Sequence, residues 1–329
     1  MQAPCVRVER EAGERTRTRL VEAELLDLDL EIVVEDGWIY LPVADSTAIP
    51  DEFEVVTREV PVRESQETPA DLLGYEPSYE RLGEVVIIDE DDPDRAREIA
   101  DAIIESDLPV RTVVNKASPI EGEERVRRWE VLVGEETETV YREYGCEYLL
   151  DIAEVYFSPR LATERHRVVE QVEAGERAFD MFAGVGPFAV PFAERGAEVV
   201  AVDVNERAVE YLRENVRRNG VEDRVTAIQG DVREVAGEYE GWADRIVMNL
   251  PHSAGEFLDS AVRLAGSECI VHYYDIQNDE DPFGPGEAAI REAAEPTYEV
   301  EVITRREVRS YAPHELNVCL DVRLSERGP

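Results

Sequence analysis

A short segment near the middle of the chain reads Asp180-Met181-Phe182-Ala183-Gly184-Val185-Gly186-Pro187-Phe188. A buried strand is predicted to end at Phe179, directly before this segment, and an apolar helix is predicted to begin at Phe188. Gly184 and Gly186 allow the backbone to turn tightly beside a ligand. A second predicted strand, Glu198 to Val202, leads to Asp203, whose carboxylate is placed to bind a ribose. The pattern predicts a nucleoside-cofactor site and favours S-adenosylmethionine.

Two alternative interpretations of this segment are a dinucleotide-binding fold and a simple tight turn. A dinucleotide-binding fold requires the motif G-x-G-x-x-G, which fails here because Ala189 stands where the third glycine belongs. A tight turn between a strand and a helix would explain the glycines without any ligand. It is disfavoured because the glycines and Asp203 occur together.

The length and composition limit the class of protein. A chain of 329 residues is too long for one ordinary core, so two or three domains are expected. No signal peptide is visible, and no apolar run approaches the ~20 residues that cross a bilayer. The four cysteines are scattered without a C-x-x-C pair, which argues against a zinc finger or a disulfide framework. We expect a cytoplasmic protein with reduced thiols and no metal site.

The formal charge of −40 is extreme, and Lys116 is the only lysine. Such an acidic composition suggests a salt-rich cytoplasm, where screening reduces self-repulsion and hydrated carboxylates maintain solubility. The net charge taken alone argues against nucleic acid as a partner. At high ionic strength, however, RNA recognition would depend on local arginines, stacking and shape.

Residues 1–62 are predicted to form a small α+β module. The expected elements are a strand at 5–9, a helix at 14–26, a hairpin at 30–43 that turns at Asp36-Gly37, and a strand at 53–60. Arg15, Arg17 and Arg19 near the start of the helix fit a solvated face and an RNA contact equally well. Residues 63–78 are polar, contain Pro69 and Pro77, and are predicted to be a linker.

Residues 79–149 are predicted to form a second α+β domain. The expected elements are a strand at 83–89, a helix at 93–106, a strand at 110–114, and an antiparallel pair, 129–133 with 139–144, around Gly134. An arginine cluster at 122–128 precedes this pair. On composition alone, the cluster could be merely a charged loop.

Residues 150–329 alternate between helix and strand, as a doubly wound sheet requires. Asp203, Asp231 and Asn249 follow predicted strands, and ligands bind such sheets outside the carboxyl ends of the strands. Two final strands, 298–304 and 318–324, are expected as a hairpin separated by residues 305–317. An antiparallel final strand is typical of a methyltransferase sheet. The predicted fold is α/β: a class I Rossmann-like S-adenosylmethionine-dependent methyltransferase domain preceded by two smaller α+β domains.

The segment Asn249-Leu250-Pro251-His252 resembles the Asn/Asp-Pro-Pro-Tyr/Phe signature of amino methyltransferases, without its second proline and aromatic ring. An exocyclic amine needs its lone pair reoriented, whereas a guanine ring nitrogen carries a proton that a base must remove. A cation would then stabilise charge on the carbonyl. Arg160 and Glu164, on one face of a helix predicted after Pro159, supply both types of side chain at i, i+4. Their spacing alone favours a structural salt bridge.

Several motifs together resemble the archaeal and eukaryotic tRNA (guanine-37 N1)-methyltransferase family, and the resemblance covers nearly the whole chain. The N-terminal module, with Gly13-Glu14-Arg15-Thr16-Arg17 and Tyr40-Leu41-Pro42, resembles the archaeal form, which has a separate tRNA-elbow-binding domain. The other matching runs are Val155 to Arg165, Asp180 to Phe188, Asn249 to Pro251, His272-Tyr273-Tyr274, and Val308 to Pro313.

The resemblance implies roles for individual residues. Glu164 matches the general base at guanine N1, and Arg125 matches the arginine that stabilises charge on O6. Tyr156, Arg160 and Arg165 match residues that order the anticodon region, while Asn249 and Pro251 match the loop that holds the flipped base. Residues implied to line the cofactor site are Phe182, Gly184, Gly186, Asp203, Asp231 and Asn249. His252 is given no role and is expected at a polar rim.

A related wybutosine-pathway enzyme, the aminocarboxypropyl transferase, is the nearest rival, because it has the same cofactor and fold. Arg125 with Glu164, and Pro187 after the glycines, favour methyl transfer. A catalytically inert RNA-binding protein is disfavoured because no expected cofactor or base position is lost. We therefore expect a cytoplasmic monomer whose partner is tRNA with guanosine at position 37 and which makes no contact with a membrane.

Overall fold

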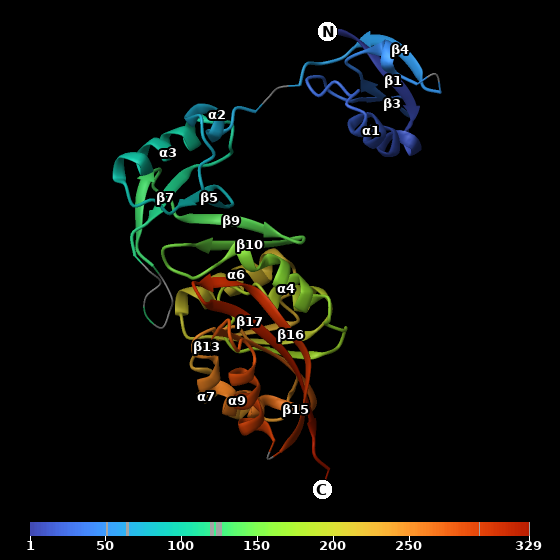
Figure 1. Cartoon of the computed structure of the whole chain (residues 1–329). Helices are drawn as coiled ribbons and strands as arrows, with labels where there is room; N and C mark the ends of the chain where they lie inside the picture. The colour runs from blue at the N-terminus through green and yellow to red at the C-terminus, as the bar shows by residue number, and fades with distance from the viewer. Residues whose placement is uncertain (51, 64–65, 119–121, 123–126, 296, 329) are drawn as a thin grey trace. The chain divides into compact units, whose positions relative to one another are not determined.

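The computed structural model describes residues 1–329 except 51, 64–65, 119–121, 123–126, 296 and 329 (Figure 1). The chain divides into two compact units, Met1–Leu72 and Leu73–Pro329. The division falls within the predicted linker, residues 63–78, where the chain also forms a short helix, α2 (Pro69–Leu73). The boundaries predicted at residues 62, 78 and 149 stay predictions.

The N-terminal unit is a small sheet with one α-helix against it in the described residues. Its elements are β1 (Gln2–Glu9), η1 (Arg10–Ala12), α1 (Gly13–Glu22), β2 (Val33–Glu35), β3 (Trp38–Pro42), η2 (Ser46–Ala48) and β4 (Glu54–Glu59). The strand order is β2-β3-β1-β4. The predicted turn at Asp36-Gly37 is confirmed, since both residues have positive φ, as a two-residue hairpin turn requires. Helix α1 ends before the predicted Leu26, because the backbone reaches positive φ at Glu24.

A second sheet lies at the start of the C-terminal unit. It contains β5 (Tyr79–Leu82), β6 (Val85–Ile88), β7 (Thr112–Lys116) and β8 (Trp129–Val133) in that order, with α3 (Pro93–Glu105) connecting the parallel strands β6 and β7. The predicted pairing of 129–133 with 139–144 is wrong. Strand β8 pairs with β7, while β9 (Glu138–Glu143) pairs with β10 (Cys146–Asp151). Gly134 separates the two pairs at φ +84°, where an added Cβ would lie 2.5 Å from the Arg111 carbonyl oxygen, so the chain turns away close to β7.

The largest sheet in the described residues has seven strands in the order β13-β12-β11-β14-β15-β17-β16. Strands β11 to β15 are parallel, and β17 runs antiparallel between β15 and β16. The predicted antiparallel final strand is therefore confirmed. The strands are β11 (Arg177–Asp180), β12 (Glu198–Asp203), β13 (Val225–Gln229), β14 (Ala243–Met248), β15 (Ala265–Asn278), β16 (Tyr298–Ala312) and β17 (Glu315–Glu326).

The final hairpin is longer than predicted. Residues 305–317 were expected to separate the two strands, but β16 and β17 continue through most of this segment and turn only at Pro313-His314. The hairpin runs past the end of β14, because Met248 pairs with Tyr273 and β15 still continues to Asn278. Strands β15, β17 and β16 thus form a wall beyond the carboxyl edge of the parallel strands.

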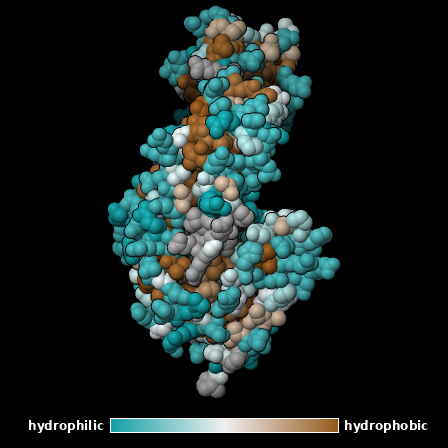
Figure 2. Space-filling model, turned by 90° about the vertical axis from the view of Figure 1, so that its left-hand side faces the viewer, coloured by the Kyte–Doolittle hydropathy of each residue, from teal (hydrophilic) through white to brown (hydrophobic). Residues whose placement is uncertain are grey.

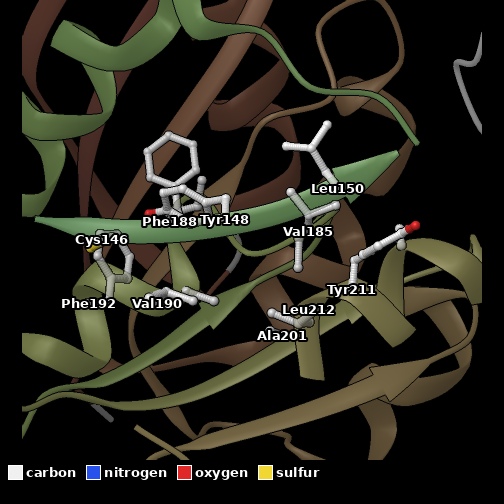
Figure 3. Close-up of a cluster of buried hydrophobic side chains, with 14 of the residues drawn as sticks. Cys146, Tyr148, Leu150, Val185, Phe188, Val190, Phe192, Ala201, Tyr211 and Leu212 are labelled. Carbon is white, nitrogen blue, oxygen red and sulfur yellow. The ribbon is translucent and has the colours of Figure 1, made fainter. Parts of the chain in front are cut away.

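Helices cover both faces of this sheet, so one hydrophobic core lies on each side of it. The helical segments are η3 (Pro159–Leu161), α4 (Ala162–Val169), α5 (Ala189–Glu194), α6 (Glu206–Arg218), α7 (Val232–Val235), η4 (Ala236–Glu238), η5 (Ala254–Phe257), α8 (Leu258–Leu264) and α9 (Gly284–Ala294). Figure 3 shows one core, where Tyr148 and Leu150 of β10 pack near Phe188, Phe192 and Leu212. The hairpin β9–β10 therefore shares a core with the large sheet. Among the described residues, no helix has both the length and the apolar character that a membrane span requires.

Candidate active site

A cavity of about 480 Å³ lies at the carboxyl edge of the large sheet. It contains most of the predicted site residues that the structure describes: Tyr156, Arg165, Phe182, Gly184, Asp203, Asp231, Asn249 and Pro251. His252, expected at a rim, also lines it and packs edge-to-face on Tyr311, with ring centroids 5.0 Å apart. The sheet topology thus brings together side chains from the ends of neighbouring strands, as the rule for open α/β sheets predicts.

Asp203 ends β12, and its carboxylate is oriented by the backbone. One oxygen accepts a hydrogen bond from the Gly184 amide at 2.7 Å, and the other accepts from the Asn205 amide at 2.9 Å. A carboxylate oxygen has two lone pairs and can accept more than one hydrogen bond. A carboxylate held in this way fits two neighbouring ribose hydroxyls.

The two glycines of the loop have different roles. Gly184 has φ +53°, and a Cβ added there would meet nothing closer than the Tyr156 carbonyl oxygen at 4.0 Å. The backbone beside Gly184 therefore faces open space, as a ligand requires. Gly186 does not line the cavity, and its added Cβ would lie 2.6 Å from Leu212 Cδ1. Gly186 is needed for the packing of the loop on α6.

Asp231 follows β13 and caps α7, accepting a hydrogen bond from the Arg233 amide at 2.9 Å. The Arg233 side chain also binds this carboxylate and lowers the pKa of Asp231.

Phe182 packs edge-to-face on Phe257, with ring centroids 5.0 Å apart. These two rings give this part of the cavity an apolar wall that suits a flat heterocycle.

Asp180 lies directly before the loop and had no predicted role of its own. Its Oδ1 accepts a long hydrogen bond from the Phe182 amide at 3.4 Å, while its buried Oδ2 has no partner in the described structure. Burial raises the pKa of Asp180 to about 7, and the nearby negative charge of Asp203 adds to this effect. Asp180 itself does not line the cavity, although the next two residues, Met181 and Phe182, do.

Glu164 lies on α4, is only 4% exposed, and does not line the cavity. Its Oε1 accepts from the Tyr274 hydroxyl at 3.1 Å and from Arg167 at 2.7 Å. Its Oε2 accepts from Arg167 at 3.0 Å and from Arg306 at 2.7 Å. Both carboxylate oxygens are therefore occupied by donors, and an incoming proton donor must displace one of them.

Arg167 is itself held by a buried network. Asp321 accepts from Arg167 at 2.6 Å and contacts His272 Nδ1 at 2.7 Å. His272 Nε2 lies 2.8 Å from a nitrogen of Arg245, so Nε2 accepts and Nδ1 donates. Burial lowers the pKa of His272. Although burial acts in the opposite direction, hydrogen bonds from His272 and Arg167 hold the pKa of Asp321 well below its usual range. The guanidinium groups of Arg167 and Arg245 contact Asp321 and His272, and their positive charge disfavours a metal ion there.

Arg160 and Arg165 lie on either side of the start of α4. Arg160 belongs to the turn η3 and pairs with Glu80, not with Glu164 as the i, i+4 spacing predicts. Glu164 pairs instead with Arg167 at i+3. Arg165 is buried, binds Glu143 at 2.8 Å and donates to the Ser158 carbonyl oxygen at 3.0 Å. Arg125 lies outside the described residues.

A second, smaller cavity of about 110 Å³ adjoins the first and shares Tyr156, Phe157, Ser158 and Arg309 with it. Among the described residues, the basic side chains that line it are Lys116, Arg127, Arg160 and Arg309, and the acidic one is Glu80. In a chain with a net charge of −40, this is a local excess of positive charge. The arrangement suits a phosphate-bearing ligand that enters next to the larger cavity.

Several residues of the site were not predicted from the sequence. Arg309 and Tyr274 lie in runs that carried the family resemblance, but no role was attached to them, and Arg306 lies just before the last of these runs. Arg167 and Asp321 gave no local signal, because they are 154 residues apart in sequence.

Three sequence profiles match successive parts of the chain: the tRNA methyltransferase 5 N-terminal domain at residues 5–51, the TYW2 N-terminal domain at 65–137, and the TRM5/TYW2 methyltransferase domain at 139–303. The tRNA (guanine(37)-N(1))-methyltransferase Trm5b of Pyrococcus abyssi is 41% identical over 97% of this chain and 98% of that protein. The tRNA(Phe) (4-demethylwyosine(37)-C(7)) aminocarboxypropyltransferase of Pyrococcus horikoshii is 35% identical over 79% of this chain and 94% of that protein.

Among solved structures, the complex of aTrm5 and tRNALeu matches with a TM-score of 0.71 at 32% identity, over 98% of this chain and 99% of that chain. The match confirms the predicted fold class of a Rossmann-like methyltransferase domain with additional N-terminal domains. The chain therefore belongs to the family of tRNA (guanine-37 N1)-methyltransferases that contain the TRM5/TYW2 methyltransferase domain.

Proposed function

We propose that this protein transfers a methyl group from S-adenosylmethionine to N1 of guanosine at position 37 of tRNA. The observation that carries the proposal is the cavity itself, which joins a ribose-binding carboxylate, Asp203, to the Asn249-Leu250-Pro251 segment in one space. The names of its full-length relatives support the same reaction and the same substrate.

The loop and strand ends on one side of the cavity are assigned to the cofactor. Asp203 binds the ribose hydroxyls, Phe182 covers the adenine ring, and Asp231 contacts the nucleoside. S-adenosylmethionine supplies an electrophilic methyl group.

The segment after β14 is assigned to the target base. Asn249 and Pro251 hold the base after it leaves the anticodon stack, and Tyr156 lies at the junction with the basic cavity. Glu164 removes the N1 proton, and Arg125 stabilises the negative charge on O6. Arg160 and Arg165 order the anticodon region, Arg160 at the exposed side and Arg165 from within the protein.

Glu164 can act as a base only after it gives up one of its present partners. Arg167 is fixed by Asp321, whereas the Arg306 side chain is 42% exposed. Arg306 is therefore the partner that an RNA phosphate can withdraw. Its departure opens one acceptor position on Oε2 of Glu164, which keeps its bond from Arg167, so the base becomes active when RNA is bound.

Aminocarboxypropyl transfer to a modified guanosine is the second candidate, because related enzymes of this type share the fold and cofactor. The aminocarboxypropyltransferase of Pyrococcus horikoshii leaves about a fifth of this chain unmatched, whereas the methyltransferase of Pyrococcus abyssi matches 97% of it.

The N-terminal module, residues 1–62, is assigned to tRNA capture, and residues 79–149 to an accessory RNA contact. We also propose that the protein is a cytoplasmic monomer in an archaeal cell with an acidic proteome.

Incubation with S-adenosylmethionine and an unmodified tRNA bearing guanosine at position 37, followed by nucleoside mass mapping, tests the proposal. A gain of one methyl group at that nucleoside is expected. A gain of an aminocarboxypropyl group would assign the second function. Titration calorimetry with S-adenosylmethionine tests for an inert RNA-binding protein, which would bind no cofactor.

A further inference from the structure

The side chain of Arg167 lies between two carboxylates. Its Nη2 donates to Glu164 Oε1 at 2.7 Å, and its Nη1 donates to Asp321 Oδ2 at 2.6 Å. The Arg167 side chain is 20% exposed, whereas the side chains of Glu164 and Asp321 are 4% and 2% exposed. One cation is therefore shared by two buried anions, and one of these anions is the proposed base.

The fold brings these three residues together from a helix and a distant strand. Glu164 and Arg167 lie three residues apart on α4, and Asp321 lies on β17. Asp321 pairs directly with His272 of β15, so their side chains share one face of the sheet. Tyr274, two residues beyond His272, points to the same face and donates to Glu164 at 3.1 Å. The sheet face that carries Asp321 is thus the face on which α4 places Glu164.

The other contact of Asp321 orients this carboxylate without compensating its charge. His272 Nδ1 donates to Asp321 Oδ1 at 2.7 Å. Because burial lowers the pKa of His272, the imidazole ring is neutral at pH 7. Arg245, on the far side of His272, is bound by Glu176 at 2.7 Å. The negative charge of Asp321 is therefore compensated by Arg167.

Proton uptake by Glu164 changes the charges in this buried cluster. The N1–H bond of guanine breaks, the proton moves to Oε2 of Glu164, and the electron pair stays on N1 for the methyl group. Glu164 is then neutral and no longer compensates Arg167. A buried charge that loses its partner is strongly unfavourable. Asp321 still compensates Arg167 after the transfer, so no unpaired charge remains.

Asp321 also affects Glu164 before the proton moves. A cation directed only at Glu164 would stabilise its charged form and make it a poor proton acceptor. Because Arg167 also donates to Asp321, its charge is divided between two carboxylates. Both effects act in the same direction and favour the protonated product at Glu164.

We propose that Asp321 is a positioning residue for methyl transfer: as the counter-ion of Arg167, it allows Glu164 to accept the N1 proton. This inference rests on the proposed function. Asp321 acts only through Arg167, since it is not among the described residues that line the large cavity. His272 holds the Asp321 carboxylate in the orientation that Arg167 requires.

Single-turnover methyl transfer with saturating S-adenosylmethionine and tRNA, measured across a range of pH, tests the proposal. The plateau rate reports the strength of the base, and the fall in rate at low pH, the acid limb, reports its protonation. The charged and titratable groups that surround Glu164 in the described structure are Arg167 of α4, Tyr274 of β15, Arg306 of β16, and Cys319 and Asp321 of β17.

Two single variants should shift the acid limb in opposite directions. Asp321→Asn leaves Arg167 to Glu164 alone, so the plateau rate should fall roughly 10-fold or more and the acid limb should move to lower pH by roughly one unit. Arg167→Gln leaves two neighbouring carboxylates without a shared cation, so the acid limb should move to higher pH. A merely structural role would lower the plateau without these shifts. An acid limb at the wild-type pH in either folded variant would overturn the proposal.

The double variant Arg167→Gln with Asp321→Asn removes the cation and its counter-ion together. Its acid limb should return close to that of the wild-type protein, and its plateau rate should exceed that of Asp321→Asn alone. A folded double variant slower than Asp321→Asn would overturn the proposal. Should neither single variant fold, a double variant more than roughly 100-fold slower than the wild-type protein would do so, because such a loss equals removal of the base.

Asp244→Asn is the matched control, because Asp244 pairs with Arg177 at 2.6 Å at a partly exposed position on β14. It removes one carboxylate from an arginine pair and should keep the wild-type plateau and acid limb. Calorimetry with S-adenosylhomocysteine should give wild-type affinity for every variant, and a large loss would assign the cluster to the cofactor site and overturn the proposal. If the wild-type protein formed no methylated guanosine at all, the proposed function would fail instead, and the mass of the product would show this directly.

Discussion

Asp180 should make the stability of the ligand-free protein depend on pH, and the substitution Asp180→Asn should remove this dependence. Its carboxyl group is buried, has one oxygen without a partner in the described structure, and has a pKa raised to about 7. In the unfolded chain an aspartate titrates near pH 3.9. The folded state therefore retains a proton that the unfolded state loses between these values. The stability contributed by protonated Asp180 is complete below about pH 3.9 and is lost as the pH rises to about 7.

The size of this effect follows from the two pKa values. The full difference of roughly 3 units corresponds to about 4 kcal/mol, of which about 2.6 kcal/mol is lost between about pH 5 and about pH 8. Asp180→Asn has no titrating carboxyl group. The difference in unfolding free energy, variant minus wild type, should therefore be about 2.6 kcal/mol larger at pH 8 than at pH 5. Any cost of the substitution that is independent of pH cancels in this comparison.

Chemical denaturation in a constant high concentration of KCl measures the four free energies. Asp223→Asn, at an exposed carboxylate, controls for the loss of one negative charge in so acidic a chain. If the free-energy gap between Asp180→Asn and wild type were the same at both pH values, Asp180 would not be protonated in the folded state. The reasoning from its burial would then be refuted.

Four further outcomes are expected. Asp203→Ala should weaken S-adenosylmethionine binding by roughly 1 to 3 kcal/mol in calorimetry, because the ribose hydroxyls lose their acceptor, and unchanged affinity would remove Asp203 from the cofactor site. Deletion of residues 1–60 should weaken tRNA capture in a binding assay and leave cofactor affinity nearly unchanged; a folded truncation without cofactor binding would make the module part of the catalytic core. Glu164→Gln and Arg125→Ala should each slow single-turnover methyl transfer by roughly 100-fold or more, with partial rescue of Glu164→Gln at higher pH, and a wild-type rate for Glu164→Gln would exclude it as the base. Activity should be supported by high salt, since screening relieves self-repulsion, and an optimum in dilute buffer would contradict this.

Much of the fold could be predicted because it depends on local signals. The glycine loop, the Asp36-Gly37 turn and the apolar strands each carry their own pattern. The choice of which strands pair has no such local pattern. The pairing of β8 with β7 depends on how Gly134 passes the Arg111 carbonyl, a contact between segments distant in sequence. The length of the final hairpin was missed because its middle is rich in charged residues, such as Arg305 and Glu307, which obscure the apolar alternation of a strand.

The site was predictable to the extent that it follows strand ends. Asp203, Asp231 and Asn249 were placed by the rule that ligands bind at the carboxyl edge, and they line one cavity. The environment of Glu164 could not be predicted in this way. Its partner Arg306 comes from a strand 142 residues away, and Arg167 depends on Asp321. Spacing on a single helix suggested Arg160, which the turn η3 instead directs to Glu80.

A strongly acidic protein that binds RNA must place its recognition in short-range contacts. The face of the protein in Figure 2 is largely hydrophilic, and arginines such as Arg7 and Arg142 are paired with glutamates. Such pairs leave little charge to attract phosphate from a distance, and the net charge of −40 repels it. At about 1 M salt, screening limits both effects to roughly 3 Å. Affinity must then come from groups in direct contact with the RNA. The basic cavity adjoins the large cavity where such contacts would form, so RNA binding and methyl transfer would share one surface.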